Sequence, residues 1–376
     1  MKVLVLTRST GEGHNRAAHA VRAAFQAKGH DCVVMDAMSV ALGRPRQPSA
    51  ASDLAAKIYG WVALRAPFAF GAVYALGEVY TRTPIPSPIY FQNAKWAEAT
   101  NEFIQANGFD AVVATHLFPQ ETLGVIRRRY PSRTKYFVVL TDYTCIPFFT
   151  EHPMDGFMIP HADLVRECVR RGVPKDRLRV TGMPVAPQFA SAQTKDAARG
   201  GLGLPSDASV FLIMSGGVGS MRMGDLGDQL LTIGGESTRL IILPGRREDL
   251  FRQIAGRYQA DPRVMVTPFT DRVADLMAAS DVLLSKPGGA SSTEAAVVGL
   301  PLVHTGTIPG NESKNARFFA SHGMSLNAPK LEDAALAAFS LYRDPAAAAQ
   351  MRAAQAANAI PDSAERVVGF VEEVSG

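Results

Sequence analysis

The sequence has few cysteines and no short segment whose side chains are spaced to hold a metal ion. Its three cysteines, Cys32, Cys145 and Cys168, are odd in number and far apart. No Cys-x-x-Cys pair occurs, and the histidines show no metal-ligand spacing. Neither a disulfide framework nor a zinc site is indicated, and a reducing cytoplasm is the expected compartment.

Long apolar runs are also missing. No stretch reaches the ~18 to 20 apolar residues that are needed to span a bilayer. The chain does begin with an apolar run, but Arg8 and a glycine-rich turn soon interrupt it. We therefore interpret residues 1–6 as the start of a buried strand and not as a signal peptide.

Three nucleotide-binding motifs are absent. There is no G-x-x-x-x-G-K-[ST] sequence, which argues against an ATPase, and no Asp-x-Asp pair to hold a metal-bound nucleotide sugar. The first glycine-rich turn lacks the G-x-G-x-x-G spacing because Arg16 occupies its last position. A dinucleotide-binding fingerprint is therefore not indicated.

The length and composition that remain suit two folded domains. The 376 residues are 47% apolar and 20% charged, enough to bury two cores. Short apolar runs alternate with helix-like stretches in both halves, which predicts an α/β protein with two doubly wound parallel sheets. The expected strands are 3–6, 31–35, 111–115, 136–141, 210–214, 240–243, 264–267, 282–285 and 302–304.

A segment rich in Pro, Gly, Ala and Ser divides the two alternating halves. We predict an N-terminal domain at residues 1–183, a linker at 184–205 and a C-terminal domain at 206–355. The N-terminal part holds 22 Lys and Arg against 15 Asp and Glu, whereas residues 184–376 hold 17 against 20. A basic first half is typical of a protein that meets lipid headgroups or nucleic acid, and equally of a solvated basic face.

One N-terminal stretch, residues 54–96, breaks the α/β pattern. It interleaves basic residues with aromatic ones, and it contains both tryptophans of the chain. This mixture suits a membrane interface, where rings lie at headgroup depth and cations meet anionic lipids. A pair of core helices with a polar rim is the alternative. The aromatic candidates for membrane or acceptor contact are Tyr59, Trp61, Phe68, Phe70 and Trp96.

Glycine-rich turns follow three of the expected strands. They span residues 9–14, 215–220 and 285–294. Glycine lets a backbone approach a ligand closely, and the N-terminus of the next helix directs N–H groups at an anion. The third turn brings three hydroxyls and Glu294 to a helix start, which suits a diphosphate and a ribose. The alternative is a helix cap stabilised by Glu294.

His14 follows the first of these turns, where α/β folds bind ligands. Its ordinary pKa range suits a base that deprotonates an alcohol. A histidine that caps the first helical turn is the alternative. Because no metal-holding motif occurs, we expect backbone amides and a helix dipole to carry the charge of a leaving diphosphate, without a metal or other cofactor.

These segments together resemble the glycolipid branch of the two-Rossmann-domain (GT-B) glycosyltransferases. The resemblance is to monogalactosyldiacylglycerol synthases and processive diacylglycerol glucosyltransferases, and more distantly to the N-acetylglucosaminyltransferase of the lipid-linked peptidoglycan precursor. It covers residues 9 to about 319 and is most specific in the Lys-x-Gly-Gly, Thr-x-Glu-Ala and Gly-Leu-Pro elements of residues 286–301. The supporting segments are residues 9–14, 141–145, 181–184 and 309–315.

The resemblance implies two Rossmann-like domains that face a cleft, with a C-terminal helix at residues 356–376 returning to the N-terminal domain. It implies that His14 is the catalytic base, and that Asn311 and Glu312 bind the donor sugar. Asn311 occupies the position where these families have glutamine, so the resemblance does not identify the donor sugar. The implied donor-nucleotide residues are Ser215, Gly216, Gly217, Phe269, Thr270, Gly288, Gly289, Ser291, Ser292, Thr293 and Glu294; the implied acceptor and phosphate loop is Gly11, Gly13 and Asp142.

The expected function is metal-independent, inverting transfer of a hexosyl group from a UDP-sugar to a lipid hydroxyl, most plausibly that of diacylglycerol. The expected partners are the UDP-sugar, the lipid acceptor and an anionic membrane surface, without nucleic acid. The protein would act from the cytoplasm on the inner face of the cell membrane. The alternatives are the peptidoglycan-precursor transferase, a UDP-sugar 2-epimerase and a regulator that binds a UDP-sugar without transferring it.

Overall fold

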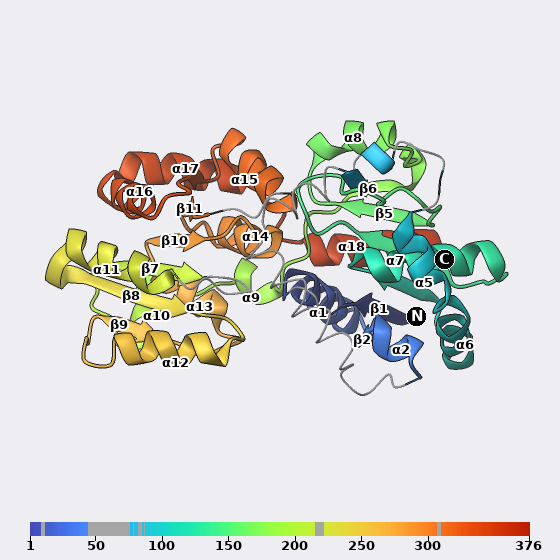
Figure 1. Cartoon of the computed structure of the whole chain (residues 1–376), viewed down its shortest axis with the longest axis horizontal. Helices are drawn as coiled ribbons and strands as arrows, with labels where there is room; N and C mark the ends of the chain where they lie inside the picture. The colour runs from blue at the N-terminus through green and yellow to red at the C-terminus, as the bar shows by residue number, and fades with distance from the viewer. Residues whose placement is uncertain are drawn as a thin grey trace. The chain divides into compact units, whose positions relative to one another are not determined.

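A computed structural model describes residues 1–8, 12–43, 76–77, 79–81, 85, 87–214, 222–306 and 310–376. The chain divides into two compact units, each an α/β structure of its own (Figure 1). The N-terminal unit comprises residues 1–186, 308–311 and 362–376, and the C-terminal unit comprises residues 187–307 and 312–361.

The N-terminal unit is built on a six-stranded parallel sheet with the strand order β2-β1-β3-β4-β5-β6. β1 pairs with β2 on one side and β3 on the other, so the direction of winding reverses between β1 and β3. The strands are β1 (Lys2–Thr7), β2 (Asp31–Asp36), β3 (Ala111–Ala114), β4 (Lys135–Val139), β5 (Gly156–Ile159) and β6 (Leu178–Val180).

Helices cover both faces of this sheet because alternate strand residues are apolar on both sides. Val3 and Val5 of β1 pack with α1 (Glu12–Ala27) and α18 (Ser363–Ser375), whereas Leu4 and Leu6 lie in the core that includes α6 and α7. The other helices of the unit are α2 (Ala37–Ala41), α5 (Pro88–Ala94), α6 (Ala97–Asn107), α7 (Leu117–Arg129), η1 (Ala162–Leu164), α8 (Val165–Arg170) and η2 (Lys175–Arg177).

The last helix of the chain, α18, belongs to the N-terminal unit. Val367, Val368 and Val371 are fully buried in its core. Glu372 also accepts from Lys28 and lies 2.8 Å from the His30 ring. This docking holds residues 362–376 against α1.

The C-terminal unit repeats the same architecture, with the strand order β12-β11-β10-β7-β8-β9. All its strands are parallel, and the winding reverses between β7 and β10. The strands are β7 (Ser209–Met214), β8 (Thr238–Leu243), β9 (Val264–Val266), β10 (Val282–Ser285), β11 (Leu302–His304) and β12 (Leu326–Asn327).

Helices of the C-terminal unit again lie on its sheet. One core of this unit joins Phe211 and Leu240 to α11 and α16. The other helices and their bounds are α9 (Pro187–Ala190), α10 (Lys195–Leu202), α11 (Met223–Gly234), η3 (Gly235–Ser237), α12 (Glu248–Arg257), α13 (Val273–Ala279), α14 (Gly289–Val298), α15 (Asn311–Ser321), α16 (Leu331–Arg343) and α17 (Pro345–Asn358).

Residues 187–202 are more ordered than their Pro, Gly and Ala content predicts, since they form α9 and α10. Arg199 of α10 is buried, and its side chain donates to the Ala279 carbonyl and to Asp281. This part of the expected linker is therefore fastened to the C-terminal unit.

The predicted fold class is confirmed, because each unit contains a doubly wound parallel sheet. Within the described part of the chain, no helix has the length and apolar character that crossing a membrane requires. In such sheets, ligands bind beyond the carboxyl ends of the strands where the winding reverses. The two positions to inspect are therefore the ends of β1 and β3, and the ends of β7 and β10.

Candidate functional site

His14 lies in the first turn of α1, beyond the carboxyl end of β1. Its Nδ1 atom lies 2.9 Å from the Thr115 carbonyl oxygen at the end of β3 and 2.7 Å from the Thr141 hydroxyl after β4. Three neighbouring strands therefore converge on this one imidazole. The histidine lies at the reversal point of the N-terminal sheet.

These contacts favour one tautomer of His14. A carbonyl oxygen can only accept a hydrogen bond, so bonding to Thr115 requires the proton on Nδ1, whereas the Thr141 hydroxyl can donate or accept. The proton on Nδ1 leaves Nε2 with its lone pair. A neutral imidazole held in this tautomer can accept a proton from an alcohol.

Burial lowers the pKa of His14 to about 4, because the charged imidazolium loses its hydration. The hydrogen bond to the Thr115 carbonyl acts in the opposite direction, but it is the smaller effect. The ring is therefore neutral at pH 7. It can act as a base over the whole physiological range.

Two neighbours of His14 escaped the sequence analysis. The His116 ring meets the His14 ring edge-on at 4.6 Å between centroids and stacks on Phe118. Arg8, which is 7% exposed, places its guanidinium 4.3 Å from the centre of the Phe118 ring. Burial, and then the nearby His14 and Arg8, keep the pKa of His116 well below its usual range. No spacing rule links these residues, because they follow two strands that are more than 100 residues apart.

Other predicted residues of the N-terminal unit lie near this edge or outside the described residues. Gly13 precedes His14 in α1, and Asp142 follows Thr141 beyond β4. Trp96 is partly exposed, and Lys95 lies 4.9 Å above its ring. The predicted residues outside the described part of the chain are Gly11, Tyr59, Trp61, Phe68 and Phe70.

In the C-terminal unit, β10 ends at Ser285 and α14 begins four residues later. Gly288 is the N-cap residue, and no side-chain cap hydrogen bond is found at this helix end among the described residues. The first N–H groups of α14 are therefore not capped by a described side chain, and the positive end of the helix dipole adds to them. An anion of phosphate size fits such a helix start.

The hydroxyls of α14 differ in what they bind. The Ser292 hydroxyl lies 2.9 Å from Nε2 of His304, and the Thr293 hydroxyl donates to the Gly289 carbonyl at 2.7 Å. Ser291 is partly exposed at the helix start. All three predicted phosphate-binding hydroxyls thus make bonds inside the unit, and the longest is that of Ser291 to the Gly288 carbonyl, at 3.5 Å. Glu294 lies in the second turn and is 2% exposed.

The loop before α14 is fastened to α15. Lys286 donates to the Glu312 carboxylate at 3.0 Å, and the buried Asn315 donates to the Pro287 carbonyl at 3.2 Å. Asn311 is the first residue of the same helix. Through Lys286, the predicted sugar-binding Glu312 is coupled to the glycine-rich loop.

Phe269 and Thr270 lie between β9 and α13 in the same unit. The Phe269 ring is 47% exposed, and the Arg246 guanidinium lies 3.7 Å above its centre. The pair presents a flat surface against which a planar base could stack. Arg246 follows β8, and no sequence motif indicated that it would lie over the Phe269 ring. Ser215, Gly216 and Gly217, which complete the predicted nucleotide set, lie outside the described residues.

Comparison with known proteins finds a different family model for each half of the chain. Residues 14–185 match the monogalactosyldiacylglycerol (MGDG) synthase family. Residues 224–367 match the C-terminal domain of glycosyltransferase family 28. The first match contains His14 and the second contains α14. The candidate residues His14 and the start of α14 therefore each lie within a match to a glycosyltransferase family model.

Individual relatives agree with this assignment. A processive diacylglycerol beta-glucosyltransferase of Bacillus pumilus is 22% identical over 351 residues, covering 91% of this chain and 87% of that protein. MurG of Acinetobacter baumannii has the same fold, with a TM-score of 0.64 at 14% identity over 99% of both chains. So does MnaA of S. aureus, solved with UDP, with a TM-score of 0.63 at 13% identity over 99% of this chain and 96% of that one.

Proposed function

Because the chain is a glycosyltransferase of the GT-B fold, with an MGDG-synthase domain and a family 28 C-terminal domain, we propose that it transfers a hexosyl group from a UDP-sugar to diacylglycerol. The B. pumilus relative is a diacylglycerol glucosyltransferase, and the family matched by residues 14–185 comprises galactolipid synthases. Both names specify diacylglycerol as the acceptor lipid, whereas the sugars differ. We therefore propose glucose or galactose as the donor sugar.

The geometry of His14 is the observation that supports the proposed transfer mechanism, in which His14 is the general base. Its Nε2 lone pair can take the proton of the acceptor hydroxyl, while Thr115 and Thr141 hold Nδ1. The deprotonated oxygen attacks the anomeric carbon as the bond from that carbon to UDP breaks. Attack from the side opposite UDP inverts the anomeric configuration.

The donor half rests on the start of α14. Its N–H groups and dipole would bind the diphosphate, with Ser291 beside them, and they would stabilise the negative charge as UDP leaves. Phe269 would stack on the uracil, Glu294 would accept the ribose hydroxyls, and Asn311 and Glu312 would bind the sugar. We propose that no divalent cation takes part in this transfer, because backbone amides and a helix dipole supply the positive potential.

An interfacial location follows from the acceptor, since diacylglycerol resides in the membrane. Apolar side chains within the predicted membrane segment are well exposed, namely Leu76, Val79, Ile85 and Phe91 at 58% to 68%. A set of exposed apolar groups suits insertion at headgroup depth. We therefore propose that residues 54–96 dock on the anionic inner face of the cell membrane.

The proposal is tested with the full chain and vesicles that contain diacylglycerol and an anionic phospholipid. UDP-glucose and UDP-galactose, each labelled in the sugar, are supplied separately without added Mg²⁺ or Mn²⁺. We expect label to appear in a glycolipid of diacylglycerol with one of them, at a rate that added Mg²⁺ does not raise.

Each other outcome contradicts a different part of the proposal. Label from UDP-N-acetylglucosamine in a peptidoglycan precursor would identify the other transferase. Conversion of a UDP-sugar to its epimer without lipid would identify an epimerase. Binding of UDP without transfer to any lipid would identify a regulator.

A further inference from the structure

A second cluster of functional side chains lies inside the N-terminal unit, away from the His14 edge. It consists of Glu121 on α7, and Glu151 and His152 in the segment between β4 and β5. Glu121 and His152 are both fully buried, with 0% of each side chain exposed, and Glu151 is partly buried. Oε2 of Glu121 lies 2.8 Å from Nε2 of His152.

Three buried polar atoms of this cluster have no hydrogen-bond partner among the described residues. They are Oε1 of Glu121, Oε2 of Glu151 and Nδ1 of His152. Two carboxylates and an imidazole in a buried position are costly unless a compensating charge or bond is present. The unpartnered oxygen of Glu121 belongs to a fully buried side chain, so bulk water does not reach it.

The surrounding backbone is shaped to hold this cluster together. Gly124, one turn after Glu121, leaves room for the His152 ring, because a Cβ there would lie 2.1 Å from the ring. Gln120 donates to the Phe149 carbonyl at 2.6 Å, and the Ser87 N–H donates to Glu151 at 2.7 Å. The two carboxylates and the imidazole are therefore positioned by their neighbours.

From this cluster we infer a structural zinc site formed by Glu121, Glu151 and His152. One ligand atom from each residue lies within 4.8 Å of the others. A tetrahedral zinc ion with bonds of ~2.0 to 2.1 Å needs its ligand atoms about 3.3 Å apart, so the Glu121 and His152 atoms, which are 2.8 Å apart, would have to separate when the ion binds. One imidazole nitrogen with carboxylate oxygens is a zinc ligand set, and a water molecule would complete the coordination.

The role of the ion would be to join α7 to the segment after β4. α7 begins next to His116, and Thr141, the partner of His14, lies near the start of the segment after β4. The ion would thus stabilise the support of the candidate base without taking part in the transfer. This inference concerns residues outside the proposed reaction and does not depend on it.

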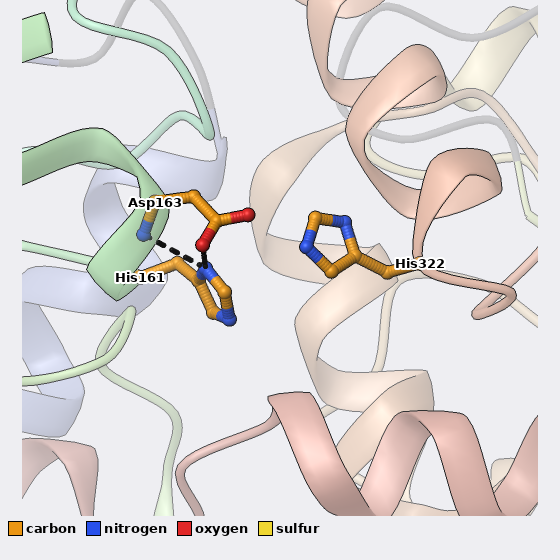
Figure 2. A group of neighbouring side chains, drawn as sticks. All are labelled: His161, Asp163 and His322. Carbon is orange, nitrogen blue, oxygen red and sulfur yellow. Dashed lines mark hydrogen bonds and ion pairs between the residues drawn. The ribbon is translucent and has the colours of Figure 1, made fainter. Parts of the chain in front are cut away.

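A surface histidine with a nearby carboxylate provides the matched control. His161 accepts from the Asp163 N–H at 3.2 Å and lies 3.6 Å from the Asp163 carboxylate, whose side chain is 59% exposed (Figure 2). His322, also drawn there, belongs to the C-terminal unit. Zinc that binds histidine and carboxylate non-specifically would occupy such a pair as readily as the buried cluster.

The test measures the zinc content of the full, untagged chain by mass spectrometry after growth with zinc and dialysis against metal-free buffer. We expect about one zinc per chain in the wild type and in Asp163→Asn. Glu121→Gln and Glu151→Gln should each retain less than about a tenth of that amount. The melting temperature of these two variants should also fall and no longer respond to added zinc.

Folding is controlled in two ways. Glu151 is only partly buried, so Glu151→Gln should keep the wild-type circular dichroism spectrum. The wild type loaded with Co²⁺ should show the visible absorption of a tetrahedral site with nitrogen and oxygen ligands. A wild type that holds no zinc and takes up none against a chromophoric chelator would overturn the inference, and so would a folded Glu151→Gln that binds zinc as tightly as the wild type.

Discussion

The reactivity of His14 depends on the two groups that hold its Nδ1 atom. The Thr115 carbonyl fixes the proton on Nδ1, and burial keeps the ring neutral. His14→Ala should therefore lower kcat about 10²- to 10⁴-fold, the usual contribution of a general base. UDP binding, measured by calorimetry, should change less than about twofold, because the donor is bound by other residues.

The control for this substitution is His19→Gln, since His19 lies on the exposed side of the same helix. It should leave kcat unchanged. The wild-type profile of kcat/KM should stay flat from about pH 8 to pH 5 and decline only near the lowered pKa of His14, about 4. An acid limb centred near 6.5, or near-normal turnover in His14→Ala, would show that another group is the base.

The proposed role of Glu294 in binding the ribose of the donor leads to a separate prediction. If its carboxylate accepts the ribose hydroxyls, Glu294→Gln should raise the donor KM about 10- to 100-fold, the value of a hydrogen bond to a charged group. The turnover at saturating donor should change far less. Because Glu294 is buried, the melting temperature must be measured alongside. A folded variant with an unchanged KM would remove the ribose role.

Some residues of the candidate site could be predicted from the sequence, whereas their contacts could not. His14 and the α14 segment could be found, because each follows an apolar strand and a glycine-rich turn. The pairing of His14 with Thr115, and the contact with His116, join positions that are about 100 residues apart. Only the strand order β1-β3-β4 brings them together. Arg246 lies in an irregular loop and gives no periodic signal at all.

At the scale of elements, α14 offers a clean test of the phosphate hypothesis. Gly288 has ordinary extended backbone angles, φ −75° and ψ 136°, and a Cβ there would meet nothing closer than the Ser291 hydroxyl at 3.5 Å. Gly288→Ala should therefore fold normally. The added methyl group would stand where a diphosphate approaches the helix start, so the donor KM should rise about tenfold or more.

Gly256→Ala is the matched control in the same unit. Gly256 lies inside α12, and a Cβ there would have open space around it. This variant should gain about 0.5 to 1 kcal/mol of unfolding free energy and keep its donor KM. If both alanine variants leave the KM unchanged, the diphosphate does not bind at the start of α14.

The strands that were predicted from sequence share one property: each has a run of apolar residues long enough to stand out. β7 and β8 are six residues long and almost wholly buried. β6 escaped prediction because Arg179 interrupts its three residues, whereas the equally short β9 (Val264–Val266) is apolar throughout. β5 has four buried residues, but it follows an irregular, aromatic-rich segment that hides its start. Short strands depend on the sheet they join more than on their own sequence.

At the scale of the whole molecule, each unit holds at least one histidine in neutral form. The partly exposed His14 lies in the N-terminal unit, and the buried His304 lies in the C-terminal unit. His304 is 2% exposed and lies between the hydroxyls of Ser292 and Ser325, at 2.9 and 3.2 Å. Burial lowers the pKa of His304 to about 4.

This lowered pKa makes the stability of the C-terminal unit depend on pH. Between pH 6.5 and 4, the unfolded chain binds a proton at His304 that the folded chain does not bind. The unfolding free energy must therefore fall as the pH falls, by up to about 3 kcal/mol for this residue. His304→Gln can still bond both hydroxyls, but it does not titrate. Denaturant unfolding of the two proteins should show the variant less stable at pH 7, with the difference shrinking toward pH 4. A difference that stays constant with pH would mean that His304 is not buried in neutral form.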